Sequence, residues 1–275
     1  METIIAPTDF SPAANNAVDY AVQLGAFLNA QVVLVNAYPL PYVNYEMSYT
    51  ADVLDVFKKS SVEKLQNLKK EIIQKYKRDF DIECVSEMGS PYDVVSIVAE
   101  KYDADLIVMG ITDDAVLIKE HIIGSTAVRI SRDLQTPTFI VPEDAKYRPV
   151  KKISFACDLE KTEETDLVYV AKYFAQTFGA KLEVIYVKGP REMELSVEKA
   201  KTISFVEEKL ENVNHRTIEI TGSDVGNELE DYFRFHQTDL VMLSPKKHSL
   251  FHYILHNSVT KDLAFHIGLP ILAIH

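Results

Sequence analysis

The chain has 275 residues, of which 47% are hydrophobic and 25% are charged, so its length and composition fit two ordinary globular domains. Its 41 acidic residues outnumber its 29 basic residues, and the resulting formal net charge of −12 argues against partners such as nucleic acid or an anionic membrane surface. We expect a cytoplasmic protein, because no apolar stretch approaches the roughly 20 residues of a membrane span and the N-terminus shows no signal-peptide pattern.

A parallel sheet covered by helices is predicted for the first half of the chain, because short apolar runs alternate there with longer amphipathic segments. The first predicted helix covers residues 12–28, with Ser11 as its N-cap and Pro12 at its first position. Three further helices are predicted at 53–76, 92–101 and 126–133, and five strands at 3–6, 31–36, 82–87, 106–109 and 138–141.

The second half of the chain repeats the first. Landmark residues match in the same order and at similar separations: Asp9 with Asp158, Tyr20 with Tyr169, and Asp105 with Asp239. Its predicted strands are 152–156, 181–187, 216–220, 240–243 and 271–274, and its second helix, at 196–212, is shorter. We therefore predict a duplicated α/β fold of two tandem, open, five-stranded parallel sheets with helices on both faces, which is a Rossmann-like arrangement. The domains are expected at 1–144 and 150–275, joined by a linker that contains two prolines.

Residues that can hold an anion follow the fourth predicted strand. Gly110 comes at the end of this strand, and Gly124-Ser125-Thr126 opens the last helix of the first domain. Glycine lets the backbone approach a phosphate closely, and the N–H groups at a helix N-terminus attract negative charge. The same residues also fit a structural role, in which Gly110 forms a tight turn and Ser125 caps the helix.

Four motifs taken together resemble the universal stress protein family: Pro7-Thr8-Asp9-Phe10-Ser11, Gly89-Ser90-Pro91, Met109-Gly110 and Gly124-Ser125-Thr126. The resemblance covers essentially the whole chain as a tandem pair. It implies an adenine nucleotide alpha hydrolase-like fold, with domains paired through their last strands, here 137–141 and 270–274. It also implies ATP or AMP binding, which some members of the family show and others lack.

The same resemblance assigns roles to individual residues. Asp9 matches the acidic residue near the ribose, and Ala37 matches the residue whose backbone meets adenine. The nucleotide-binding set that it implies is Pro7, Thr8, Asp9, Ala37, Met109, Gly110, Gly124, Ser125 and Thr126.

The phosphate-binding motif departs from the family pattern, Gly-x2-Gly-x9-Gly-[Ser/Thr]. Asp113 stands at the second glycine, Asp114 follows it, and one extra residue precedes Gly124. A carboxylate about 4 Å from a phosphate charge costs roughly 1 kcal/mol in water and about 4 kcal/mol at an effective dielectric constant near 20. We therefore expect the first domain to bind AMP, adenosine or ATP weakly, or to bind ATP with Mg²⁺ bridging the acids to the phosphates.

The second domain departs further, since Ser244, Lys247 and Asn257 occupy the three glycine positions and only the hydroxyl of Ser258 is kept. We expect this site to be degenerate, with Asn257 and Ser258 capping the last helix.

His248, His252 and His256 recur every fourth residue, and His266 follows them. This spacing puts three imidazoles on one helix face, which suits zinc when a fourth ligand is near. Apolar residues interleave with the histidines, and this favours a core helix over a metal site.

The chain has two cysteines and none of the common catalytic motifs. Cys84 and Cys157 have no CxxC partner, and we expect both to be small buried side chains. The chain has no GxSxG, GxxxxGK[ST], HExxH or GxGxxG motif, so an enzyme is not predicted.

The first hypothesis is a cytoplasmic stress-response regulatory protein that binds an adenine nucleotide in the first domain only. The alternatives are a nucleotide-free interaction protein and a slow nucleotide hydrolase, and exposed final strands predict a homodimer in each case.

Overall fold

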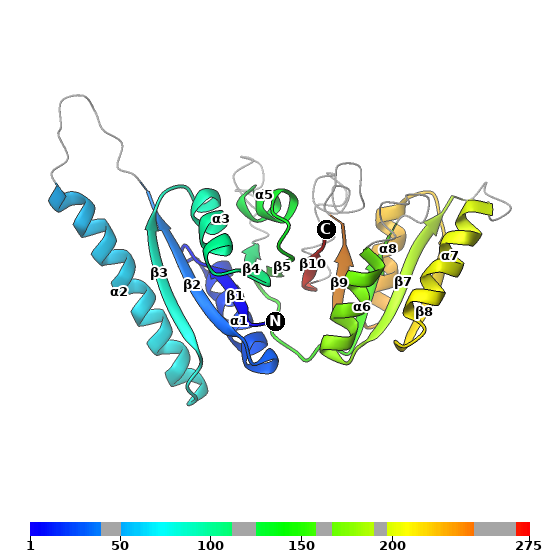
Figure 1. Cartoon of the computed structure of the whole chain (residues 1–275), viewed down its shortest axis with the longest axis horizontal. Coiled ribbons are helices and arrows are strands. Elements are labelled where there is room, and N and C mark those ends of the chain that lie inside the picture. The colour runs from blue at the N-terminus through cyan, green and yellow to red at the C-terminus, as the bar shows by residue number, and fades with distance from the viewer. Residues whose placement is uncertain (40–50, 112–124, 158–166, 190–196, 245–267) are drawn as a thin grey trace, which may run out of the picture. The chain divides into compact units, whose positions relative to one another are not determined.

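The computed structural model describes residues 1–39, 51–111, 125–157, 167–189, 197–244 and 268–275 (Figure 1). The chain divides into two compact units, Met1–Tyr147 and Arg148–His275, and each unit is a sheet with helices packed on it. Within the described ranges, no helix is both long and apolar enough to span a membrane.

The sheet of the first unit consists of five parallel strands. These are β1 (Thr3–Pro7), β2 (Gln31–Tyr38), β3 (Ile82–Met88), β4 (Leu106–Ile111) and β5 (Thr138–Pro142), in the spatial order β3-β2-β1-β4-β5. The chain therefore first builds outward from β1 to β3 and then returns to the other side of β1. In open sheets of this kind, ligands bind beyond the carboxyl ends of the strands where the order reverses, which here is between β1 and β4.

Four described helices cover this sheet: α1 (Pro12–Leu28), α2 (Ala51–Tyr76), α3 (Pro91–Lys101) and α5 (Ser125–Asp133). Helix α1 begins as the sequence predicts, because the Oγ atom of Ser11 accepts a hydrogen bond from the backbone N–H of Ala14 and Pro12 takes the first position. It ends at Asn29, whose left-handed φ of 55° stops the helix.

An apolar cluster joins α3 and α5 to one face of the sheet. Alternate strand residues such as Ile5, Val33 and Ile107 pack against Val94 and Ile130 from the helices, and all five are buried. Burying each such side chain contributes about 1.5–3 kcal/mol, so this cluster is a main source of the unit's stability.

The second unit repeats the strand order of the first. Its elements are β6 (Lys152–Ala156), α6 (Leu167–Phe178), β7 (Lys181–Lys188), α7 (Val197–Leu210), β8 (His215–Thr221), α8 (Val225–Phe235), β9 (Leu240–Leu243) and β10 (Ile271–Ala273). The five strands are parallel in the order β8-β7-β6-β9-β10. The predicted α/β fold with parallel sheets is therefore confirmed, and α8 begins after its N-cap, Asp224.

One sequence match between the two halves is wrong by a single residue. The helices α1 and α6 end at left-handed residues, Asn29 and Gly179, and these must correspond. Counting back from them places Tyr169 opposite Asp19 and not opposite Tyr20. The burial agrees, because Tyr20 is 2% exposed and Tyr169 is 48% exposed.

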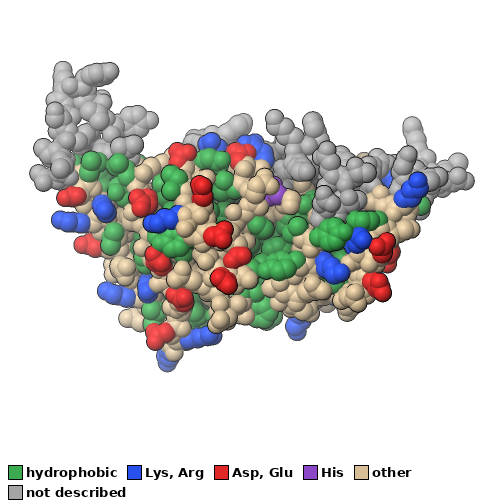
Figure 2. Space-filling model, in the orientation of Figure 1, with side chains coloured by type: hydrophobic (Ala, Val, Ile, Leu, Met, Phe, Trp, Pro, Cys, Tyr) green, Lys and Arg blue, Asp and Glu red, His purple; other side chains and the backbone are tan. Residues whose placement is uncertain are grey.

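Acidic, basic and hydrophobic side chains are interspersed on the face of the described residues that Figure 2 shows.

The two cysteines differ in burial. Cys157 is buried as predicted, whereas Cys84 is only half-buried, because it lies in the edge strand β3. Burial still raises the pKa of the Cys84 thiol above its ordinary value.

Candidate functional site

Three residues of the predicted nucleotide set meet at the carboxyl edge of the first sheet. Pro7 pairs with Val35, and Ile5 pairs with Ile107, so continuing the register brings Pro7 level with Met109. Ala37 lies two residues beyond Val35 on β2. Pro7 and Ala37 are half-buried and Met109 is 8% exposed, so this edge offers a small apolar surface next to solvent.

The turn from β1 into α1 is held by its own polar groups. The backbone N–H of Thr8 donates to the carbonyl of Val35 (2.8 Å), and its Oγ1 accepts from the N–H of Phe10 (2.9 Å). Phe10 adopts a left-handed φ of 68°, which non-glycine residues seldom take. The exposed carboxylate of Asp9 accepts from the N–H of Ser11 (2.9 Å), so the turn presents this acid to solvent in a defined position.

A buried hydrogen-bond network, which we did not predict, fastens this turn to the rest of the unit. The Nδ2 atom of Asn36 donates to the carbonyl of Thr8 (2.7 Å), and its Oδ1 accepts from Ser61 Oγ (2.6 Å). Ser86 Oγ in turn donates to Ser61 Oγ (2.6 Å). Asn36 and Ser61 are 7% and 4% exposed. The signal in the sequence was a lone asparagine in an otherwise apolar strand, since a buried amide requires partners.

Lys64 on α2 adds positive charge beside the turn. Its Nζ atom lies 5.4 Å from the centre of the Phe10 ring, within the range of a cation–π interaction. An anion near this turn would therefore meet an exposed cation as well as the acid of Asp9.

The structure gives a reason for the glycine at position 110 that differs from the two predicted from the sequence, which were close approach of a phosphate and a tight turn. Gly110 does not form a tight turn, because it lies inside β4 and pairs with Val141. A Cβ atom at this position would lie 2.3 Å from the carbonyl oxygen of Ala13 and 2.9 Å from the nitrogen of Ala14. Glycine is therefore required for the first turn of α1 to rest on β4.

The helix that carries Ser125 and Thr126 is fastened to its neighbour. Thr126 is half-buried near the start of α5, and Ser125 is the first residue of that helix. Arg129 lies 3.7 Å from the centre of the Tyr92 ring and thereby ties α5 to α3. A hydrogen bond from Arg132, together with the charges of Arg132 and Arg129, lowers the pKa of Asp133 at the other end of the helix.

Several predicted residues lie outside the described residues: Gly124, Asp113 and Asp114 of the phosphate motif, Lys247, Asn257 and Ser258 of the second domain, and His248, His252, His256 and His266. Among the residues that are described, no group of three or more His, Cys, Asp or Glu side chains could hold a metal ion. Ser244 is described, and it lies buried just beyond β9 at 3% exposure. Its Oγ atom has no hydrogen-bond partner within the described part of the chain.

The chain is similar to known proteins of one family. The model of the universal stress protein family matches residues 1–142. Universal stress protein MJ0531 of Methanocaldococcus jannaschii is 26% identical over 147 residues, which make up 52% of this chain and 83% of that protein.

A solved structure that spans nearly the whole chain has the same fold. A universal stress protein from Archaeoglobus fulgidus covers 99% of this chain and 97% of its own length, with a TM-score of 0.69 and 14% identity. Another universal stress protein, crystallised in complex with cAMP, is 28% identical and covers 51% of this chain and 96% of its own length. Its TM-score is 0.39, so its ligand does not inform the geometry of the edge described above.

Proposed function

Because the chain belongs to the universal stress protein family, we propose that its first domain binds an adenine nucleotide and acts as a regulatory module in a cytoplasmic stress response. The observation that carries this proposal is the convergence of Pro7, Ala37 and Met109 at the point where the strand order reverses, beside the exposed carboxylate of Asp9. In this proposal the protein is a binding module and has no catalytic residues.

The convergent residues suit the adenosine part of a nucleotide. The half-buried side chains of Pro7 and Ala37 supply an apolar surface on which a purine can lie, and the buried Met109 adds to this surface from the neighbouring strand β4. The carboxylate of Asp9 can accept hydrogen bonds from ribose hydroxyl groups, because carboxylate oxygens have several acceptor sites. The network through Asn36 keeps the turn in place for this contact.

The phosphate groups would lie toward Gly124, Ser125 and Thr126, where the N-terminus of α5 favours negative charge. Because Asp113 and Asp114 add two negative charges to this segment, we propose that AMP binds without a metal and that ATP requires Mg²⁺. The second unit has lost the glycine of this motif at Ser244, and we propose that it binds no nucleotide.

Isothermal titration of the full chain with AMP and ATP, each with and without Mg²⁺, tests the proposal. We expect Asp9→Asn to weaken AMP binding about fivefold, since about 1 kcal/mol is a typical net contribution of one hydrogen bond. Asp81→Asn is the matched control, because the exposed Asp81 immediately precedes β3 and therefore lies at the amino edge of the sheet, opposite the carboxyl edge that carries Asp9.

If no nucleotide binds under any of these four conditions, the proposal fails and the nucleotide-free interaction protein replaces it. Equal effects of Asp9→Asn and Asp81→Asn would refute the assignment of the ribose contact to Asp9.

A further inference from the structure

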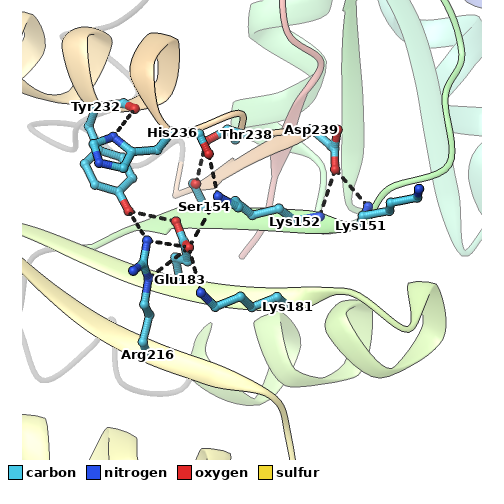
Figure 3. A network of polar contacts seen from close by, with 10 residues as sticks. All are labelled: Lys151, Lys152, Ser154, Lys181, Glu183, Arg216, Tyr232, His236, Thr238 and Asp239. Carbon is cyan, nitrogen blue, oxygen red and sulfur yellow. Dashed lines mark hydrogen bonds and ion pairs between the residues drawn. The ribbon is translucent and has the colours of Figure 1, made fainter.

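The second unit contains a fully buried carboxylate that three basic side chains surround (Figure 3). Glu183 on β7 is 0% exposed, and its Oε1 atom lies 2.8 Å from Arg216 Nη2, 3.2 Å from Lys181 Nζ and 3.6 Å from Lys152 Nζ. Its Oε2 atom accepts a hydrogen bond from the hydroxyl of Tyr232 (2.7 Å). We call these five residues the Glu183 cluster.

The Glu183 cluster carries two positive charges in excess. Three cations face one carboxylate, and the Tyr232 hydroxyl is neutral, since burial and its hydrogen bond to Glu183 raise its pKa to about 12. The nearby Asp239 accepts hydrogen bonds from the backbone N–H groups of Lys151 and Lys152, and Figure 3 draws no contact between its carboxylate and the three cationic groups. The excess stands out in a chain whose net charge is −12.

The three cations are held close together and still reach solvent. Each of the three basic nitrogens lies within 3.6 Å of Glu183 Oε1. The distance between any two of these nitrogens therefore cannot exceed the sum of their distances to that oxygen. Mutual repulsion of this kind is relieved when an anion joins them. The side chains of Lys152, Lys181 and Arg216 are 24%, 33% and 47% exposed, so an anion can approach from the solvent side.

The fold does not require a charged residue at the position of Glu183. Glu183 pairs with Ser154 and Arg216, and the same register in the first unit pairs Val33 with Ile5 and Glu83. Val33 is fully buried among apolar neighbours. Burying an ionic cluster stabilises a protein no better than well-packed apolar residues do, so stability alone does not account for the Glu183 cluster.

We propose that Lys152, Lys181 and Arg216 form a binding site for a small doubly charged oxyanion, with phosphate as the chemical type. The guanidinium group of Arg216 and the ammonium group of Lys181 suit phosphate oxygens, and the buried Glu183 keeps both groups in place before the anion arrives. Lys152 and Lys181 are the first residues of β6 and β7. This site therefore lies at the amino edge of the second sheet, whereas the proposed nucleotide site lies at the carboxyl edge of the first.

The test is titration of the full chain with inorganic phosphate at constant ionic strength, followed by calorimetry. We expect Lys181→Met to weaken phosphate binding about tenfold, because it removes one partly screened charge near the anion. We expect Glu183→Gln to tighten binding about tenfold, because it removes a negative charge beside the anion while the amide oxygen can still accept hydrogen bonds from the cationic groups. Lys201→Met, an exposed lysine on α7 outside the cluster, is the matched control and should change nothing.

The two substitutions should change phosphate affinity in opposite directions, and this distinguishes an anion-binding site from a purely structural cluster. If the Glu183 cluster were only structural, both substitutions would lower the melting temperature and neither would change phosphate affinity. That result would overturn the proposal, as would acetate binding as tightly as phosphate. Arg216→Lys, which keeps the charge, serves as a second variant if Lys181→Met does not fold, and we expect it to weaken phosphate binding through loss of the planar guanidinium. Phosphate affinity unchanged in Arg216→Lys would also overturn the proposal.

Discussion

Adding one methyl group at position 110 should destabilise the first unit strongly. In Gly110→Ala the new Cβ atom would lie 2.3 Å from the carbonyl oxygen of Ala13, whereas carbon and oxygen atoms that are not bonded need more than 3 Å. Both sides of this contact are backbone, so no side chain can rotate away. Either α1 or β4 must therefore move by about 1 Å.

The loss of unfolding free energy in Gly110→Ala depends on how firmly α1 and β4 are held in place. Strand β4 pairs with β1 and β5, and α1 begins directly after the turn that Thr8 and Asn36 fasten. Overpacking in such places typically costs 1–3 kcal/mol, and we expect the upper end, about 3 kcal/mol. The stabilisation of about 0.4–1 kcal/mol that alanine brings through the unfolded chain is too small to offset it. For a domain of this size, about 3 kcal/mol lowers the melting temperature by roughly 6–12 °C.

Differential scanning calorimetry and urea unfolding of the full chain measure this loss. Gly179→Ala is the control, because Gly179 has a left-handed φ of 63° and open space around it. It should cost about 1–2 kcal/mol from backbone strain alone. If Gly110→Ala unfolds within 0.5 kcal/mol of the parent protein while nucleotide affinity falls, the glycine serves the ligand and not the contact with α1.

Three further predictions concern the turn, the helix start and the Glu183 cluster. Asn36→Leu leaves the carbonyl of Thr8 and the hydroxyl of Ser61 without their partner, and we expect a loss of about 2–4 kcal/mol in urea unfolding; a loss below 1 kcal/mol would mean that water replaces the amide. Ser11→Ala removes the N-cap of α1 and should reduce the free energy of unfolding by about 1 kcal/mol, with no effect if the cap contributes nothing in solution. Burial opposes ionisation of Glu183, but hydrogen bonds from Tyr232 and Lys181, with the charges of Lys152 and Arg216, lower its pKa below the ordinary 4.5. The stabilisation from this carboxylate is therefore complete above about pH 4.5 and is lost as the pH falls through the lower pKa of the folded state. Melting temperatures measured from pH 6 to pH 3 should show this loss in the parent protein and not in Glu183→Gln; parallel curves would contradict it.

Much of the fold follows from patterns a few residues long. Alternation of apolar runs with amphipathic segments predicted the parallel sheets, and the pair Ser11 and Pro12 predicted the start of α1, because a cap and a fixed φ act within one turn. Several strands nevertheless run farther than predicted, since β4 includes Gly110 and β1 includes Pro7. Pairing with a neighbouring strand extends a strand, and the neighbour is distant in the sequence.

Residue types and motifs along the chain were thus sufficient for the α/β architecture and the family. They could not show that Gly110 makes room for α1, that Asn36 joins the β1 turn to α2, or that Glu183 gathers three cations. Each of these is a contact between elements that lie far apart in the chain. The energy of such a contact depends on the distance between its residues and on their burial. Both are set only when the strands and helices have packed together.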